Sequence, residues 1–81
     1  MSYARNPEVL WRSTSRGPVV LLGDREPARL HGAAAVVWEL LDDVMDRATV
    51  EAEARTVIGT APDVGPALDE LVAQGLVVLV A

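Results

Sequence analysis

The hydrophobic period of this chain changes within residues 29–43, RLHGAAAVVWELLDD. Before this segment, apolar residues alternate with polar ones or run in short blocks, which is the pattern of strands. Within it, Ala34, Val37, Trp38 and Leu41 have the i, i+3, i+4, i+7 spacing of one helix face. Strands followed by helices in an 81-residue chain predict a single α+β domain, residues 1–81.

Three short strands are expected before the change of period. Residues 9–13 alternate, with Val9 and Trp11 on one face. Residues 19–22, VVLL, form a continuous apolar run, as in a strand covered on both faces. Residues 28–31 follow a turn that contains Gly and Pro, so we predict a three-stranded antiparallel meander. A second copy of the chain, in a homodimer, is one candidate cover for the second face of the sheet.

Three helices are expected after the strands. The first spans residues 32–43. The second begins near Thr49 as its N-cap and ends at Gly59, and the third begins at Asp63 as its N-cap and stops at residues 74–75. The apolar faces of the second and third helices are Val50, Ala54, Val57 and Ile58, and Val64, Leu68, Leu71 and Val72. Residues 76–80, LVVLV, could add a final strand, and the order βββααα predicts a winged helix-turn-helix type of fold.

Composition excludes several classes of protein. The chain has no Cys, which excludes disulfides, thiolate catalysis and Cys-based metal sites. Its longest apolar runs, GAAAVVW and GLVVLVA, are far shorter than the roughly 20 residues of a membrane span. The first nine residues lack the apolar segment of a secretory signal, so we expect a cytoplasmic protein without a membrane partner.

The distribution of charge opposes binding to nucleic acid. The formal net charge is −5; residues 1–31 carry five Arg against three acidic residues, and residues 32–81 carry two Arg against nine. The recognition helix of a winged-helix protein would fall in residues 63–74, which contain no Lys or Arg for phosphates or base edges. We therefore expect no nucleic-acid partner.

The sequence offers no convincing catalytic site. The serines lie in the N-terminal segment and the first turn, so the sequence does not indicate a Ser–His–Asp triad with the single His, His31. Asp42, Asp43 and Asp46 match the DDxxD motif with which isoprenoid synthases hold Mg²⁺ and diphosphate, but those enzymes are large helical bundles with a second acidic cluster. A solvated helix end, with Asp46 helping to start the next segment, is the favoured interpretation. The sequence predicts no enzyme, no metal and no cofactor.

The third expected strand has the features of a sheet edge. Pro27 precedes it, and Pro at a strand start is typical of an edge. An open edge can accept an extended peptide as an additional strand. Alternatively, Pro27, Arg25 and Arg29 only protect the edge from aggregation, and the residues alone favour this second explanation.

Three stretches resemble the PqqD-like proteins, also called RiPP precursor peptide recognition elements. Residues 30–43, LHGAAAVVWELLDD, resemble the family pattern L-N-P-T-A-x-x-I-W-E-L-L-D-G, and residues 63–76, DVGPALDELVAQGL, resemble D-V-x-x-F-L-x-x-L-x-x-x-G-L. Residues 49–54, TVEAEA, are similar to the family's T-V-x-E-I-A. The chain departs from the family where His31 and Gly32 replace Asn and Pro, and where Ala67 replaces a common Phe.

This resemblance implies a non-catalytic module. Such a module binds the leader segment of a ribosomally made precursor peptide and presents it to a modifying enzyme or leader peptidase of the same pathway. The leader is expected to pair with the third strand and to lie against the third helix, and the basic strand region would suit an acidic leader. The implied binding residues are Arg25, Arg29, Leu30, His31, Asp63, Ala67, Leu71 and Gln74. The alternative is a winged-helix regulatory or protein-interaction domain without a precursor peptide ligand.

Overall fold

The fold contains a three-stranded antiparallel sheet followed along the chain by three helices. The computed structural model describes residues 1–58 and 64–80. Its elements are β1 (Ser2–Arg5), β2 (Val9–Arg12), β3 (Val19–Leu22), β4 (Ala28–Arg29), α1 (Gly32–Leu40), β5 (Met45–Asp46), α2 (Arg47–Ile58), α3 (Val64–Ala73) and β6 (Val77–Val80). Strands β2, β3 and β4 are antiparallel neighbours in that order. The α+β class is therefore confirmed, and the βββααα order holds for β2–β3–β4 and the three helices, with β1, β5 and β6 in addition.

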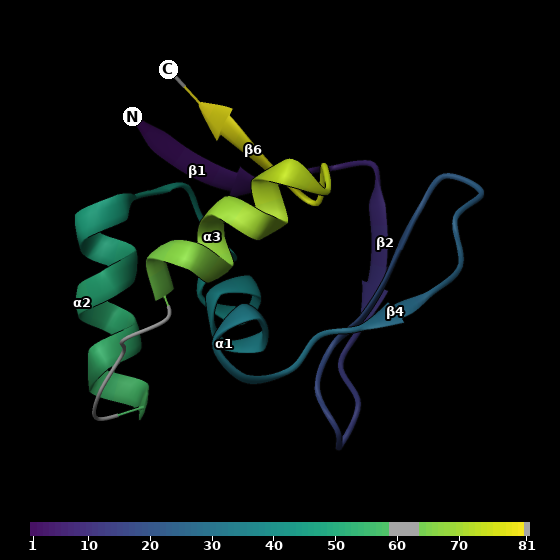
Figure 1. The fold of residues 1–81 in the computed structure, drawn as a ribbon, viewed down its shortest axis with the longest axis horizontal. Coiled ribbons are helices and arrows are strands. Elements are labelled where there is room, and N and C mark those ends of the chain that lie inside the picture. Colours follow the sequence, from purple (N-terminus) through teal and green to yellow (C-terminus); the bar gives the residue numbers. More distant parts are fainter. Residues whose placement is uncertain (59–63, 81) are drawn as a thin grey trace.

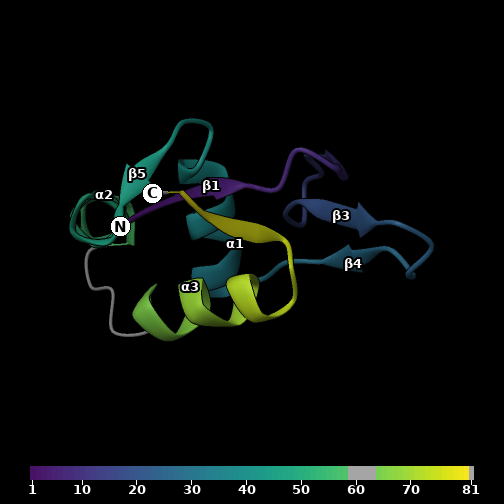
Figure 2. The ribbon, with the colours of Figure 1, turned by 90° about the horizontal axis from the view of Figure 1, so that it is seen from above.

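A second sheet is present that the sequence does not predict. It has the order β5–β1–β6, and all of its pairings are antiparallel. Its last strand, β6, confirms the strand expected near the C-terminal end, whereas β1 lies where no strand is predicted. Figures 1 and 2 place the β2–β3–β4 sheet at one end of the molecule and the second sheet beside the helices.

The helix boundaries differ from those expected at two points. Helix α1 ends at Leu40, before the two Asp residues whose negative charge is unfavourable at a helix C-terminus. Helix α2 begins at Arg47, and Asp46 is its N-cap because the Thr49 N–H donates to Asp46 Oδ1 over 2.7 Å. The prediction of Thr49 as the cap is therefore wrong, while the expected role of Asp46 is confirmed. The predicted boundaries at residues 59 and 63 lie outside the described residues.

The core is shared by the helices and both sheets. Helix α1 packs against α2 and α3, and β6 packs against α3. The predicted apolar faces are mostly confirmed, but Val57 is 64% exposed and does not join the core; the side chain of Ile58 lies outside the described structure. No helix within residues 1–58 and 64–80 is long and apolar enough to cross a bilayer. The largest fully buried side chains are Trp38, Leu68, Leu71, Val20, Val37, Val50, Val64, Val77 and Pro18.

Arg5 joins the second sheet to the first. Its Nε donates to the Trp38 carbonyl over 2.8 Å and its Nη2 to the Glu39 carbonyl over 3.2 Å, both near the C-terminal end of α1. The guanidinium carbon also lies 4.4 Å from the ring centre of Trp11 on β2. The rings of Trp11 and Trp38 meet edge to face, with centres 5.8 Å apart. One side chain of β1 thus contacts α1 and β2 together, which fixes the position of the β2–β3–β4 sheet.

Candidate functional site

Strand β4 is an open edge of the β2–β3–β4 sheet. Arg29 pairs with Val19, and the next N–H, that of Leu30, donates to the Pro18 carbonyl over 2.9 Å. Successive residues of a strand direct their N–H and C=O groups to opposite sides, so those of Arg29 point away from β3. Ala28 and Arg29 are both exposed. The main chain of Arg29 therefore offers a donor and an acceptor to an incoming strand.

The open edge is short because neither flanking residue offers both a free N–H and a free C=O. Pro27, on one side, has no N–H to donate. On the other side, the His31 carbonyl accepts the Ala35 N–H over 3.3 Å as α1 begins. The site is therefore centred on Arg29, with the carbonyl of Pro27 and the N–H of His31 at its limits.

A close main-chain approach supports this edge from the β2–β3 turn. Gly17 has a φ of 110°, and a Cβ at this position would lie 2.7 Å from the carbonyl oxygen of Leu30. Its N–H donates to the Thr14 carbonyl over 3.1 Å, which closes the turn. Only glycine allows both this φ and this approach. Gly17 thus sets the path along which Leu30 leaves the sheet toward α1.

The C-terminal end of α3 is tied to the β3–β4 turn. Arg25 Nη1 donates to the Gln74 carbonyl over 2.8 Å, just beyond the last residue of α3. The Gln74 side chain donates in turn to Glu70 Oε1 over 2.7 Å. A guanidinium at a helix C-terminus is favoured by the helix dipole. This hydrogen bond therefore holds the β3–β4 turn against the C-terminal end of α3.

The structure places the implied binding residues in different surroundings. Arg25 and Gln74 are in contact, and Arg29 and His31 are exposed on or beside β4. The side chains of Leu30 and Leu71, 8% and 2% exposed, belong to the core. Ala67 on α3 is half-buried against the core, so it could line a surface only through its exposed part. Asp63 lies outside the described residues.

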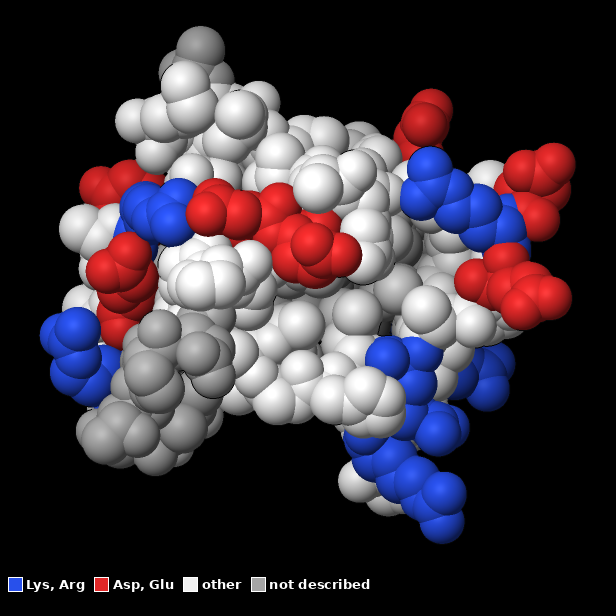
Figure 3. All heavy atoms as spheres, viewed as in Figure 1, with Lys and Arg blue, Asp and Glu red and all other residues white. Residues whose placement is uncertain are grey.

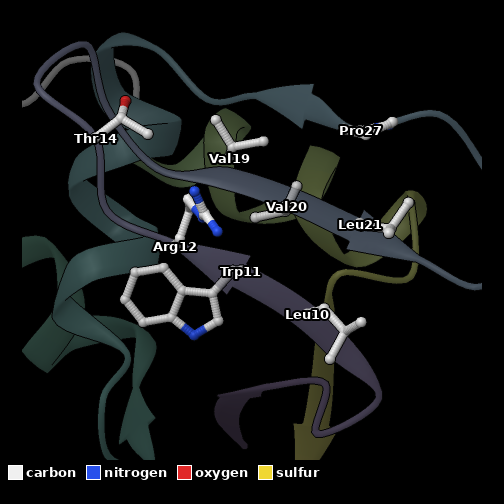
Figure 4. Close-up of a pocket in the computed structure, with 8 residues that line it drawn as sticks. All are labelled: Leu10, Trp11, Arg12, Thr14, Val19, Val20, Leu21 and Pro27. Atoms are coloured by element: carbon white, nitrogen blue, oxygen red, sulfur yellow. The ribbon is translucent and has the colours of Figure 1, made fainter.

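The outer face of the sheet carries residues that the sequence reasoning missed. Val9 and Val20 are buried on the inner face, so the alternate residues face outward. Two cross-strand rows result: Leu10, Leu21 and Pro27 form the apolar row, and Arg12, Val19 and Arg29 form the basic row. Figure 4 shows the apolar row aligned across the strands, in a depression of about 530 Å³. The alternation of residues 9–12 indicates this face as well: if Val9 and Trp11 face inward, Leu10 and Arg12 face outward.

This outer face is open to solvent. Leu10 is 69% exposed, and Val19 and Leu21 are half-buried. The prediction that the apolar run in β3 is covered on both faces is thus met on one face only within this chain. An exposed apolar row beside two Arg side chains makes this face a candidate recognition surface.

Charges are distributed unevenly over the molecule. Figure 3 shows Arg side chains alone at the lower edge of the strand end, Arg and acidic side chains together above them, and a row of acidic side chains across the region of α3. On the helices, Arg47 Nη1 lies 3.0 Å from Asp69 Oδ1, and this hydrogen bond lowers the pKa of Asp69 and raises that of Arg47. Arg12 and Arg29, by contrast, make no ion pair within residues 1–58 and 64–80. Their charges are therefore available to a ligand.

The acidic motif of residues 42–46 has structural roles. Asp43 Oδ1 accepts the Val44 N–H over 2.8 Å, and hydrogen bonding by the side chain and then the main chain of Thr49 lowers the pKa of Asp46. No group of three or more His, Asp or Glu side chains among the described residues is arranged to hold a metal ion. Comparison with protein-family models, with curated proteins and with solved structures found no match. The features that distinguish the candidate site are therefore the open edge of β4, the two outer rows and the unpaired Arg charges among the described residues.

Proposed function

We propose that this chain is a non-catalytic module that binds an extended peptide by strand addition to β4. The peptide is the leader segment of a ribosomally made precursor, as the resemblance to PqqD-like recognition elements implies. The chain presents it in the cytoplasm to a modifying enzyme or leader peptidase. The single observation that supports this proposal most is the outward N–H and C=O of Arg29 on an exposed edge strand.

The chemistry of the edge favours a peptide over other ligands. An added strand satisfies the donor and acceptor of Arg29, and each such hydrogen bond contributes roughly 0.5–1.5 kcal/mol. The nearby guanidiniums of Arg12 and Arg29 favour an acidic peptide, mainly through the association rate and the pairing register. The acidic surface over α3 remains free for the enzyme that receives the peptide (Figure 3).

The charge of α3 opposes the winged-helix regulatory alternative. Residues 64–73 contain Asp69 and Glu70 but no Lys or Arg, and both acidic side chains are exposed. A recognition helix needs basic or amide side chains for phosphates and base edges. Repulsion between these carboxylates and a phosphate backbone would oppose insertion of α3 into a groove.

Titration with leader peptides encoded beside the gene tests the proposal. Calorimetry should detect saturable binding, and an NMR titration of the ¹⁵N-labelled chain should shift the Arg29 amide. Arg29→Ala removes the side chain and keeps the N–H, whereas Arg29→Pro removes both. Because the Leu30 N–H, not that of Arg29, bonds to β3, the proline variant leaves the strand pairing intact.

The difference between these two variants isolates the main-chain donor. Arg29→Pro should bind about three- to tenfold more weakly than Arg29→Ala, which corresponds to one hydrogen bond. Circular dichroism of both variants checks that they fold. Absence of saturable binding to every neighbouring leader, or equal affinity of the two folded variants, contradicts the proposal. A gel shift on duplex DNA that weakens with added salt would instead support the regulatory alternative.

A further inference from the structure

The register of the sheet determines what an added strand would meet on its outer face. The apolar row ends at Pro27 and the basic row ends at Arg29, and both residues flank the free edge. Neighbouring strands lie about 4.8 Å apart, so a strand beside β4 would extend each row by one residue. Its residue opposite Arg29 would face the outer side of the sheet together with the Arg29 side chain.

Antiparallel addition is the orientation that the edge favours. The N–H and C=O of Arg29 both point outward, and a residue directly opposite can bond to both in an antiparallel pair. Because the added strand runs against β4, its residue opposite Arg29 comes first. The residue opposite Pro27 follows two positions later. The residue between them faces the inner side, beside Ala28.

Each of these two positions has a distinct chemical preference. Opposite Arg29, an acidic side chain would meet the basic row, whose two guanidiniums have no ion pair among the described residues. Opposite Pro27, an aliphatic side chain would extend the apolar row and cover part of the depression of about 530 Å³ (Figure 4). Opposite-charge and apolar cross-strand pairs are both favourable on one face of a sheet.

We infer that the ligand of this edge carries an acidic residue followed two positions later by an aliphatic residue, the acidic one opposite Arg29 and the aliphatic one opposite Pro27. This inference rests on the proposed strand addition and adds the sequence pattern that the site selects. It also gives the outer face of the sheet a role in specificity. Leu10 and Leu21 continue the aliphatic contact across β2 and β3.

Three synthetic peptides of identical composition test the pattern. All are short, acetylated and amidated, with one Glu and one Leu in a Thr-rich extended sequence. The first has Glu two positions before Leu, the second has Leu two positions before Glu, and the third has them adjacent, on opposite faces of a strand. NMR titration of the ¹⁵N-labelled full chain detects weak binding through the Arg29 amide.

The first peptide should bind roughly five- to tenfold more tightly than the third, because it makes two cross-strand pairs on the outer face that the third cannot make together. It should also bind more tightly than the second, because antiparallel addition would place the Leu of the second peptide opposite Arg29 and its Glu opposite Pro27. Replacing Glu by Lys in the first peptide should weaken its binding to the native chain. The same Lys peptide should bind the Arg29→Glu variant more tightly than the Glu peptide does. Arg16→Glu, at an exposed turn position, is the charge-matched control and should not respond to this exchange.

The outcomes separate the pattern from the strand addition itself. If the three peptides shift the Arg29 amide with equal affinity, the pattern is wrong and the strand addition remains. A tighter second peptide contradicts the antiparallel orientation and overturns the stated order. If neither these peptides nor the neighbouring leaders shift that amide, the pattern and the proposed function both fail.

Discussion

Replacement of Arg5 by Met should destabilise the fold by an amount that its contacts predict. The change removes hydrogen bonds to the carbonyls of Trp38 and Glu39, and it removes a guanidinium placed 4.4 Å from the ring centre of Trp11. Hydrogen bonds from charged donors contribute about 1.5–3 kcal/mol when shielded and less when exposed. An exposed cation–π contact adds roughly 0.5–1 kcal/mol. We expect a loss of about 2–4 kcal/mol in the free energy of unfolding.

Met is the appropriate replacement because its unbranched apolar stem keeps most of the packing of the Arg5 methylenes. Urea unfolding, followed by tryptophan fluorescence and by far-UV circular dichroism, gives the free energy by linear extrapolation. Arg5→Lys retains the charge but not the planar group that bonds two carbonyls at once, so its loss should be intermediate. A domain of this size has about 5–10 kcal/mol of stability, so the Met variant should unfold at clearly lower urea.

Arg16→Met is the matched control. Arg16 is exposed in the β2–β3 turn, and its side chain makes no hydrogen bond or ion pair with the described residues. Its replacement should change the free energy of unfolding by about 0.5 kcal/mol or less. If Arg5→Met loses no more than this control, Arg5 does not join the two sheets energetically and the reasoning is refuted.

Two other substitutions test local features of the fold. Gly17→Ala should lower the free energy of unfolding by about 1–3 kcal/mol, measured by thermal unfolding, because the added Cβ would meet the Leu30 carbonyl. Gly23 also has a positive φ but open space around it, so Gly23→Ala should cost only about 1 kcal/mol. Equal losses in the two variants would contradict the steric argument. Asp46→Ala should lower the Tm at neutral pH because the Thr49 N–H loses its acceptor. The folded-state pKa of Asp46 is lowered below 3.8, so its stabilisation is present above that pH and is lost as the pH falls through the folded-state pKa. The Tm values of native and variant chains should therefore converge in acid, and a constant difference would exclude the charged cap.

Local periodicity was sufficient to predict the β2–β3–β4 sheet and the three helices. Val9 and Trp11 alternate, and Val37, Trp38 and Leu41 repeat at helical spacing, so each pattern is contained within a few residues. Such patterns report which side of an element is buried. They therefore also identified most of the core.

The second sheet could not be predicted in this way because its pairing is long-range. Strand β1 contains one large apolar residue, Tyr3, and forms because Arg5 lies opposite Val77 and Ser2 opposite Val80. Nothing within residues 2–5 indicates that partner. The early end of α1 has a related cause in addition to the two Asp residues, because its carbonyls at Trp38 and Glu39 accept hydrogen bonds from Arg5 of the same unpredicted strand.

The candidate site was predicted in part. Pro27 and the short strand after it indicate an edge, and the structure has Ala28 and Arg29 exposed there. The sequence alone could not separate the main-chain and side-chain roles of Leu30. Its N–H bonds to β3 and its side chain enters the core, so the outward groups belong to Arg29 instead.

The shortness of β4 determines how a ligand could be bound specifically. One residue with two outward main-chain groups contributes roughly 1–3 kcal/mol, whereas micromolar binding needs about 8 kcal/mol. The main chain of this edge is therefore too small to bind a strand tightly by itself, which also limits pairing with unrelated strands. Most of the affinity must come from side chains on the two faces of the added strand. On the outer face those are the apolar row and the basic row, so Leu10→Ser, remote from the edge on β2, should weaken the first peptide more than the third. An equal effect on both peptides would show that the apolar row does not contribute to the discrimination between them.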